Sequence, residues 1–101
     1  MKPLPPEEQA SLCALAQAGD IKARDTLILR SMGLVHLKAH YWIRMARGLE
    51  LGDLVAEGSL GLFDAIRKFD PTKGASFATY SQRWIDQRIR TALVSDREMK
   101  T

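Results

Sequence analysis

The sequence has 101 residues and a net charge of +3, a length that allows one domain with a single small core. Its hydrophobic content of 46% argues against a disordered chain, and no apolar run approaches the roughly 20 residues that span a bilayer. The first nine residues lack the apolar core of a signal peptide, and the single cysteine excludes an internal disulfide. We therefore expect a soluble, cytoplasmic protein whose mild positive charge favours an anionic partner.

Apolar residues recur at helical rather than alternating spacing, so we predict an all-α fold, a small bundle of about four helices. Residues 1–101 are expected to form one domain. Three of the four prolines lie in residues 1–6, which predicts an extended lead-in. We expect the bundle to occupy residues 7–95 and the polar residues 96–101 to fray.

A first helix should begin near Pro6 and end at Gly19. Asp20 can then cap a second helix that extends from residue 21 towards residue 47. Residues 26–49 include no acidic side chain but several basic ones. These basic side chains form either a solvated face or one wall of a nucleic-acid channel.

Two histidines, His36 and His40, lie four positions apart and can share one face of the second helix. A metal site needs further ligands, and the sequence offers no cysteine or histidine suited to supply them. We therefore predict ordinary histidines, no metal and no cofactor.

The third helix is predicted to begin with Asp53 as its N-cap and to end near Phe69. Asp53, Glu57 and Asp64 should lie near one another on the side opposite its apolar stripe. Glycines 58 and 61 fall in mid-helix, where each costs about 1 kcal/mol relative to alanine. We expect the close approach of another backbone to offset this cost, either from the same chain or from a partner.

Asp70 and Pro71 should end the third helix, and Ser76 can cap a fourth helix over residues 77–95. Four aromatic residues are interleaved with basic residues in this part of the chain, a mixture suited to holding unstacked bases beside a phosphate backbone. The aromatic residues are Phe69, Phe77, Tyr80 and Trp84, and the basic ones are Lys73, Arg83, Arg88 and Arg90. Arg83, Gln87, Arg90 and Thr91 should project together as a reading face.

No arrangement of residues predicts catalysis, and we expect a protein that is not an enzyme. Cys13 falls on the apolar side of the first helix and is expected to be a small buried hydrophobe. Asp53 and Glu57 lack a neighbouring histidine or lysine that would make them an acid–base pair. The mid-helix glycines lack the lysine and hydroxyl of a phosphate-binding loop.

Residues 53–85 closely resemble region two of bacterial RNA polymerase sigma factors of the housekeeping-related family. The matching motifs are D-L-x-x-E-G-x-x-G-L at Asp53–Leu62, A-I-x-K-F-D-P at Ala65–Pro71, and G-x-x-F-x-T-Y at Gly74–Tyr80, with W-I following at Trp84. The upstream pattern A-x-x-G-D-x-x-A-R-x-x-L-I at Ala16–Ile28 extends the resemblance. It covers almost the whole chain from about residue 12 to residue 93.

The resemblance implies docking on the coiled coil of the polymerase β′ subunit and binding of the non-template strand of a melted minus-ten promoter element. With the residue analysis above, it predicts two sets of site residues. The polymerase-binding set is Asp53, Leu54, Glu57, Ser59, Leu62 and Phe63. The DNA-binding set is Phe69, Lys73, Phe77, Thr79, Tyr80, Arg83, Trp84, Gln87, Arg88, Arg90 and Thr91.

Two departures from the family pattern reduce the aromatic surface. Arg83 precedes Trp84 where housekeeping members typically have two adjacent tryptophans, and Ala75 stands where an aromatic ring is common. Both differences favour an alternative sigma factor with its own promoter preference. Members of this family usually continue into further domains, so the segment is either part of a longer chain or a small stand-alone protein.

Two alternative functions fit parts of the same sequence. The first is a sigma-like interaction module that binds polymerase or an anti-sigma factor without productive promoter recognition. The second is a general basic domain that binds duplex DNA, for which a charge of +3 is small.

Overall fold

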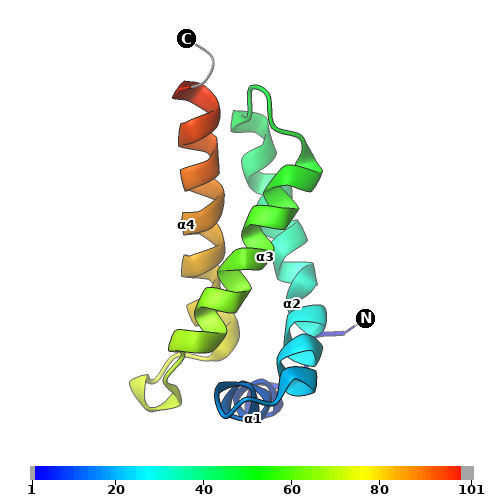
Figure 1. Ribbon diagram of the computed structural model, residues 1–101, viewed down its shortest axis with the longest axis vertical. Coiled ribbons are helices and arrows are strands. Elements are labelled where there is room, and N and C mark those ends of the chain that lie inside the picture. The colour runs from blue at the N-terminus through cyan, green and yellow to red at the C-terminus, as the bar shows by residue number, and fades with distance from the viewer. Residues whose placement is uncertain (1, 99–101) are drawn as a thin grey trace.

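The computed structural model describes residues 2–98, which contain four α-helices, two short 3-10 helices and no strand (Figure 1). The elements are α1 (Pro6–Gln17), α2 (Ile21–Trp42), η1 (Ile43–Met45), α3 (Leu51–Lys68), η2 (Pro71–Lys73) and α4 (Phe77–Glu98). Helices α2, α3 and α4 run lengthwise beside one another, and α1 lies across their lower end (Figure 1). This confirms the predicted all-α bundle. Within the described residues, no helix is both long and apolar enough to cross a bilayer.

The turn between α1 and α2 follows the sequence prediction. Gly19 has a φ of 105°, a left-handed conformation that glycine adopts without steric cost. The side chain of Asp20 accepts a hydrogen bond from the backbone N–H of Ala23 at 3.0 Å, which caps α2. Helix α1 begins at Pro6, one residue before the predicted start of the bundle.

The end of α2 differs from the prediction that the helix continues to residue 47. The α-helix ends at Trp42, and η1 and an extended Ala46 follow. The backbone N–H groups of Arg47 and Gly48 donate instead to the carboxylate of Asp96, at 2.7 and 3.0 Å. This buried carboxylate draws the chain out of the helix and towards α4.

Helix α3 begins two residues before Asp53, so the prediction that Asp53 is the N-cap is wrong. Glu50 is the N-cap, and Asp53 occupies the third helical position, where its carboxylate accepts from the N–H of Glu50 at 2.8 Å. An acidic side chain suits either position, because both lie at the positive end of the helix dipole. The helix ends at Lys68, before the predicted break at Asp70 and Pro71.

Helix α4 begins as predicted, because the Ser76 hydroxyl accepts from the N–H of Thr79 at 3.2 Å. It extends to Glu98, three residues beyond the predicted end at residue 95. Residues 96–98 of the predicted frayed tail are therefore helical, since Asp96 is buried and hydrogen-bonded to the loop before α3. Residues 99–101 of that tail lie outside the described residues.

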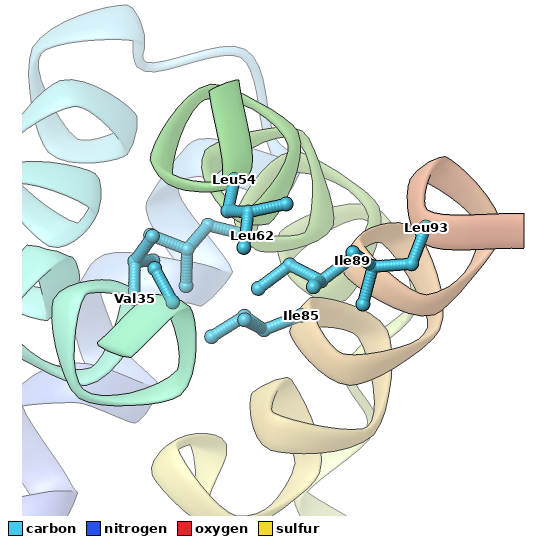
Figure 2. Packing of buried hydrophobic residues seen from close by; sticks show 7 residues of the cluster. Val35, Leu54, Leu62, Ile85, Ile89 and Leu93 are labelled. Atoms are coloured by element: carbon cyan, nitrogen blue, oxygen red, sulfur yellow. The ribbon is translucent and has the colours of Figure 1, made fainter. Parts of the chain in front are cut away.

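The main core lies where α2, α3 and α4 meet, and its side chains converge between the three helices (Figure 2). It contains Val35, Ala39, Leu54, Leu62, Ile85, Ile89 and Leu93. A second cluster joins α1 to the lower ends of the other helices and contains Cys13, Leu27, Ala65, Ile66, Phe69 and Phe77. Burial raises the pKa of the Cys13 thiol to about 11, as expected for a thiol that serves as a core hydrophobe.

The two mid-helix glycines of α3 allow close packing within the chain. A Cβ at residue 61 would lie 2.7 Å from the carbonyl oxygen of Trp84 and 2.8 Å from the Cα of Ile85. A Cβ at residue 58 would lie 2.9 Å from a side-chain carbon of Val35. Of the two alternatives left open, close approach within the same chain is therefore the one observed.

Candidate nucleic-acid and protein interface

Four aromatic rings form a continuous row at the junction of α3 and α4. The ring centroids of Phe69 and Phe77 lie 5.5 Å apart, those of Phe69 and Tyr80 5.7 Å apart, and those of Tyr80 and Trp84 6.4 Å apart. Phe69 and Phe77 are buried, whereas Tyr80 and Trp84 are partly exposed. The inner pair supports the outer pair from behind, so only the outer rings offer a surface on which a base can stack.

The outer rings line a small hollow of about 170 Å³ together with Arg83 and Gln87. The ammonium group of Lys68 lies 5.5 Å from the centre of the Trp84 ring, within cation–π range. The hollow therefore combines π faces, an amide and one cation, and a second cation lies beside the Trp84 ring. This is the chemistry that a flipped base and its phosphate require.

The remaining residues of the predicted DNA-binding set lie on both sides of this hollow. Lys73 in η2 is exposed. Arg90 and Thr91 continue the exposed side of α4 beyond the hollow. The exposed side of α4 thus presents a basic and amide-bearing surface over several turns of helix.

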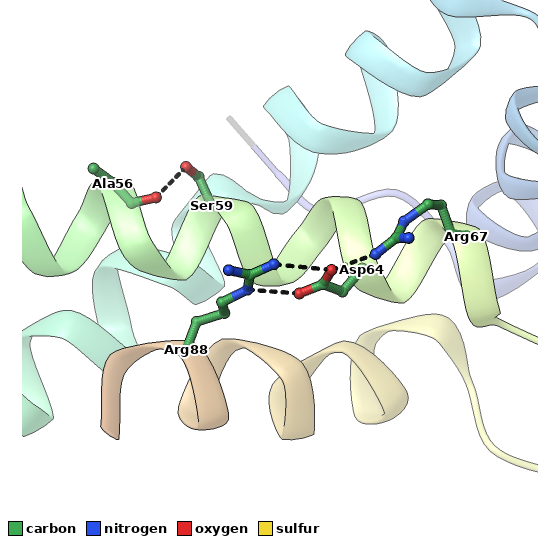
Figure 3. Close-up of polar contacts among 5 residues, drawn as sticks. All are labelled: Ala56, Ser59, Asp64, Arg67 and Arg88. Carbon is green, nitrogen blue, oxygen red and sulfur yellow. Dashed lines mark hydrogen bonds and ion pairs between the residues drawn. The ribbon is translucent and has the colours of Figure 1, made fainter. Parts of the chain in front are cut away.

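The Arg88 guanidinium turns towards α3 and is paired there, although 43% of the side chain stays exposed (Figure 3). Its Nε and Nη2 atoms donate to the two carboxylate oxygens of Asp64, at 2.7 and 3.2 Å. Arg67 donates to the same carboxylate. Asp64 lies near Glu57 as predicted, but the expectation that it lies on the side opposite the core is wrong, since only 7% of its side chain is exposed.

The electrostatics of this pair follow from its geometry. Hydrogen bonds from Arg88 hold the pKa of the Asp64 carboxyl below its ordinary value, and Arg67 adds to the effect. Asp64 in turn raises the pKa of Arg88. The carboxylate is therefore ionised at neutral pH, and the ion pair links α3 to α4.

The predicted polymerase-binding set divides into accessible and buried residues. Asp53 and Phe63 are exposed, and Glu57 and Ser59 are partly exposed. Leu54 and Leu62 are 0% exposed and belong to the main core. Their burial means that these two leucines support the exposed face of α3 and offer no surface to a partner.

The exposed face of α3 also includes residues that the sequence analysis did not single out. Leu60 is 43% exposed. It lies three positions before Phe63 and seven after Asp53, a spacing that places the three residues on one side of a helix and could have identified Leu60 from the sequence. The guanidinium of Arg24 on α2 lies 5.3 Å from the centre of the Phe63 ring. The contact between Arg24 and Phe63 could not be predicted from sequence spacing, because the two residues are far apart in the sequence.

The two candidate faces adjoin along the groove between α3 and α4. Glu57, from the predicted polymerase-binding set, and Thr91, from the DNA-binding set, line the same hollow of about 280 Å³. Asp53 and Thr91 line a second hollow farther along the groove. Within residues 2–98, no group of three or more acidic, histidine or cysteine side chains is placed to hold a metal ion.

The comparisons with known proteins point to one family. A family model described as Sigma-70 region 2 matches residues 27–98. The chain is 38% identical over 89 residues to RNA polymerase sigma factor RpoS of Coxiella burnetii, a match that covers 88% of this chain and 25% of the relative. A probable RNA polymerase sigma-C factor of Synechocystis sp. is 57% identical over 53 residues, 52% of this chain and 13% of the relative.

The RNA polymerase sigma-C factor of Nostoc sp. is 43% identical over 79 residues, which cover 78% of this chain and 18% of the relative. The chain thus spans a quarter or less of the length of each of these three relatives.

Proposed function

Because the chain belongs to the Sigma-70 region 2 family, we propose that it docks on RNA polymerase core and binds the non-template strand of a melted minus-ten promoter element. The observation that carries the proposal is the hollow formed by Tyr80, Arg83, Trp84 and Gln87. It places two partly exposed rings beside a guanidinium and an amide. Sigma factors are transcription initiation factors without catalytic activity, so the proposed role is binding and not catalysis.

The free energies explain why such a domain acts with polymerase. Stacking on an aromatic side chain stabilises a bound base by roughly 1–3 kcal/mol, whereas taking a base out of the duplex costs a few kcal/mol. Two accessible rings therefore capture bases that open, but they do not open a promoter unaided. We place the chain in the cytoplasm, where bacterial RNA polymerase acts.

For docking, we propose that the exposed face of α3 contacts the coiled coil of the β′ subunit. Its exposed and partly exposed members are Asp53, Glu57, Ser59 and Phe63. The Asp53 carboxylate accepts a hydrogen bond from the backbone N–H of Glu50, and the Ser59 hydroxyl donates to the carbonyl of Ala56 at 2.7 Å (Figure 3). Glu57 and Phe63 are therefore the members best able to interact with a partner through their side chains.

The strand-binding half of the proposal is tested with a double variant, Tyr80→Ala with Trp84→Ala. Fluorescence titration with a minus-ten non-template oligonucleotide should show affinity at least tenfold lower than for the unmodified protein, because two stacking contacts are removed, each worth roughly 1–3 kcal/mol. Tyr41→Ala is the matched control, since Tyr41 is an exposed aromatic residue on α2. Unchanged affinity in the double variant would refute strand binding at this hollow and favour the interaction-module alternative.

The docking half is tested with Glu57→Lys, which reverses a charge on the exposed face of α3. We expect this variant to lose capture by the isolated β′ coiled coil. Glu7→Lys on α1 makes the same charge change at an exposed position away from α3. Equal capture of both variants would show that the docking face lies elsewhere.

A further inference from the structure

The pair of Asp64 and Arg88 places a buried anion beneath exposed cations. Only 7% of the Asp64 side chain is exposed, against 43% for Arg88 and 64% for Arg67. Both guanidinium groups donate to the one carboxylate, and Arg88 does so through two nitrogen atoms (Figure 3). A guanidinium that is paired in this way is the group that also binds phosphate in a two-pronged geometry.

The surroundings of this pair are those of the proposed DNA surface. Asp64, Arg67 and Arg88 line the 280 Å³ hollow together with side chains from the DNA-facing side of α4. Those side chains are Trp84, Gln87 and Thr91. A DNA strand that follows α4 would therefore pass within reach of both guanidinium groups.

We propose that Asp64 is an internal competitor of nucleic-acid phosphate, which occupies Arg88 and Arg67 and so lowers affinity for DNA of unrelated sequence. Phosphate contacts carry no sequence information, whereas contacts with bases do. A carboxylate that withdraws two cations from the strand leaves a larger share of the binding to Tyr80, Trp84 and Gln87. Asp64 is thus a specificity-determining residue, and Arg88 is its structural partner. This inference rests on the proposed function insofar as the hollow faces DNA.

The pairing geometry makes the competition effective. Asp64 is ionised at neutral pH, because its hydrogen bonds to Arg88 keep its pKa low. The carboxylate is fixed on α3 before any strand arrives, so it competes without the entropic cost of association. Lys68 is exposed in the same hollow and has no ion pair among the described residues, so one cation remains available to a phosphate.

The test is the salt dependence of binding to a single-stranded oligonucleotide of non-promoter sequence. Asp64→Asn keeps the size of the side chain and removes its charge. If two phosphate contacts are gained, the slope of log affinity against log salt steepens by about 1.4, since each contact with a single strand contributes roughly 0.7. Elution from immobilised heparin at a higher salt concentration is the second readout.

Glu8→Gln is the control, because it changes the net charge equally at an exposed residue without an ion pair among residues 2–98. Equal slopes for Asp64→Asn and Glu8→Gln would overturn the proposal.

A second variant tests the same idea from the opposite side and does not depend on how Asp64→Asn folds. Arg88→Gln should leave the affinity for the non-promoter strand within about twofold of the unmodified protein, because this guanidinium is already occupied. A fall of several-fold with a shallower salt slope would show that Arg88 contacts phosphate directly, and the proposal would be wrong. The double variant Asp64→Asn with Arg88→Gln should lose about half of the increase in slope, since one of the two released cations is gone.

The two proposals can fail independently. A protein that shows no preference for the minus-ten sequence, but whose Asp64→Asn variant has a steeper salt slope, would refute the proposed function and leave the competitor role intact. A clear preference for the minus-ten sequence, with the same salt slope for Asp64→Asn and the unmodified protein, would support the proposed function and refute the competitor role.

Discussion

Gly61 on α3 lies against Ile85 on α4 so closely that a Cβ at residue 61 would come within 2.8 Å of the Ile85 Cα. No side chain separates the two backbones at this point. The helix that we propose docks on polymerase and the helix that we propose reads DNA are therefore held at a spacing that only glycine permits. Their exposed faces are fixed relative to each other by this contact and by the ion pair beside it.

Gly61→Ala should destabilise the fold by about 1–3 kcal/mol, because the added methyl group must push against backbone atoms that cannot move aside. Urea unfolding followed by circular dichroism measures this change. Gly33→Ala is the control, since Gly33 lies within α2 and a Cβ there would have no neighbour within 4 Å. That variant should gain up to about 1 kcal/mol. A Gly61→Ala protein as stable as the unmodified one would contradict the close approach.

Phe77→Ala should destabilise the fold, because Phe77 is only 1% exposed and belongs to the second core cluster. The expected loss is about 3–5 kcal/mol of unfolding free energy. Tyr41→Ala removes an aromatic ring that is 53% exposed, and it should cost much less. At temperatures where Phe77→Ala is still folded, its affinity for the minus-ten strand should fall less than that of Trp84→Ala, because Phe77 supports Tyr80 through Phe69 and offers no stacking surface. A loss as large as that of Trp84→Ala would show that Phe77 contacts the strand directly.

Asp64 should make the fold sensitive to acid. Its pKa is lowered in the folded state, so its stabilising contribution is present above its unfolded pKa of about 3.9 and is lost as the pH falls through the folded value. Asp64→Asn should therefore be less stable than the unmodified protein at neutral pH, and this difference should shrink as the pH falls below the unfolded pKa. Thermal unfolding across this range measures it. A stability difference that does not change with pH would show that ionisation of Asp64 contributes nothing.

Arg83→Trp should strengthen binding of the minus-ten strand, because it adds a third ring to the hollow that Tyr80 and Trp84 line. The expected gain is about 1–3 kcal/mol from stacking, with a salt slope shallower by roughly 0.7 if Arg83 contacts a phosphate. Arg97→Trp is the control, at an exposed position of the same helix outside this hollow. A gain of equal size in both variants would indicate non-specific adhesion of tryptophan.

Features that depend on neighbouring residues were predictable from the sequence. Local preferences of single residues account for the left-handed Gly19, the Asp20 and Ser76 caps and the end of α3 ahead of Pro71. The burial of Cys13 likewise followed from the apolar spacing of its helix. The N-cap of α3 was predicted three residues too late, because Glu50 and Asp53 are both acidic and either can serve the first turn.

Features that depend on distant residues were not predictable. Arg88 was assigned to the DNA surface by its charge, and its partner Asp64 lies 24 positions away on another helix. Leu54 and Leu62 were assigned to the docking surface through a motif, although the helical spacing of the apolar residues in α3 already favoured core contacts for both. The structure turns both leucines into the core.

The hydrogen bonds between Asp96 and the loop before α3 have a consequence for the order in which contacts form during synthesis of the chain. The Arg47 and Gly48 amides obtain their carboxylate acceptor only after residue 96 has left the ribosome. Gln17 likewise waits for the carbonyl of Ile66, and Trp42 for the carboxylate of Asp86. Individual helices form within about a microsecond, but these hydrogen bonds of the first half form only after the second half has been translated.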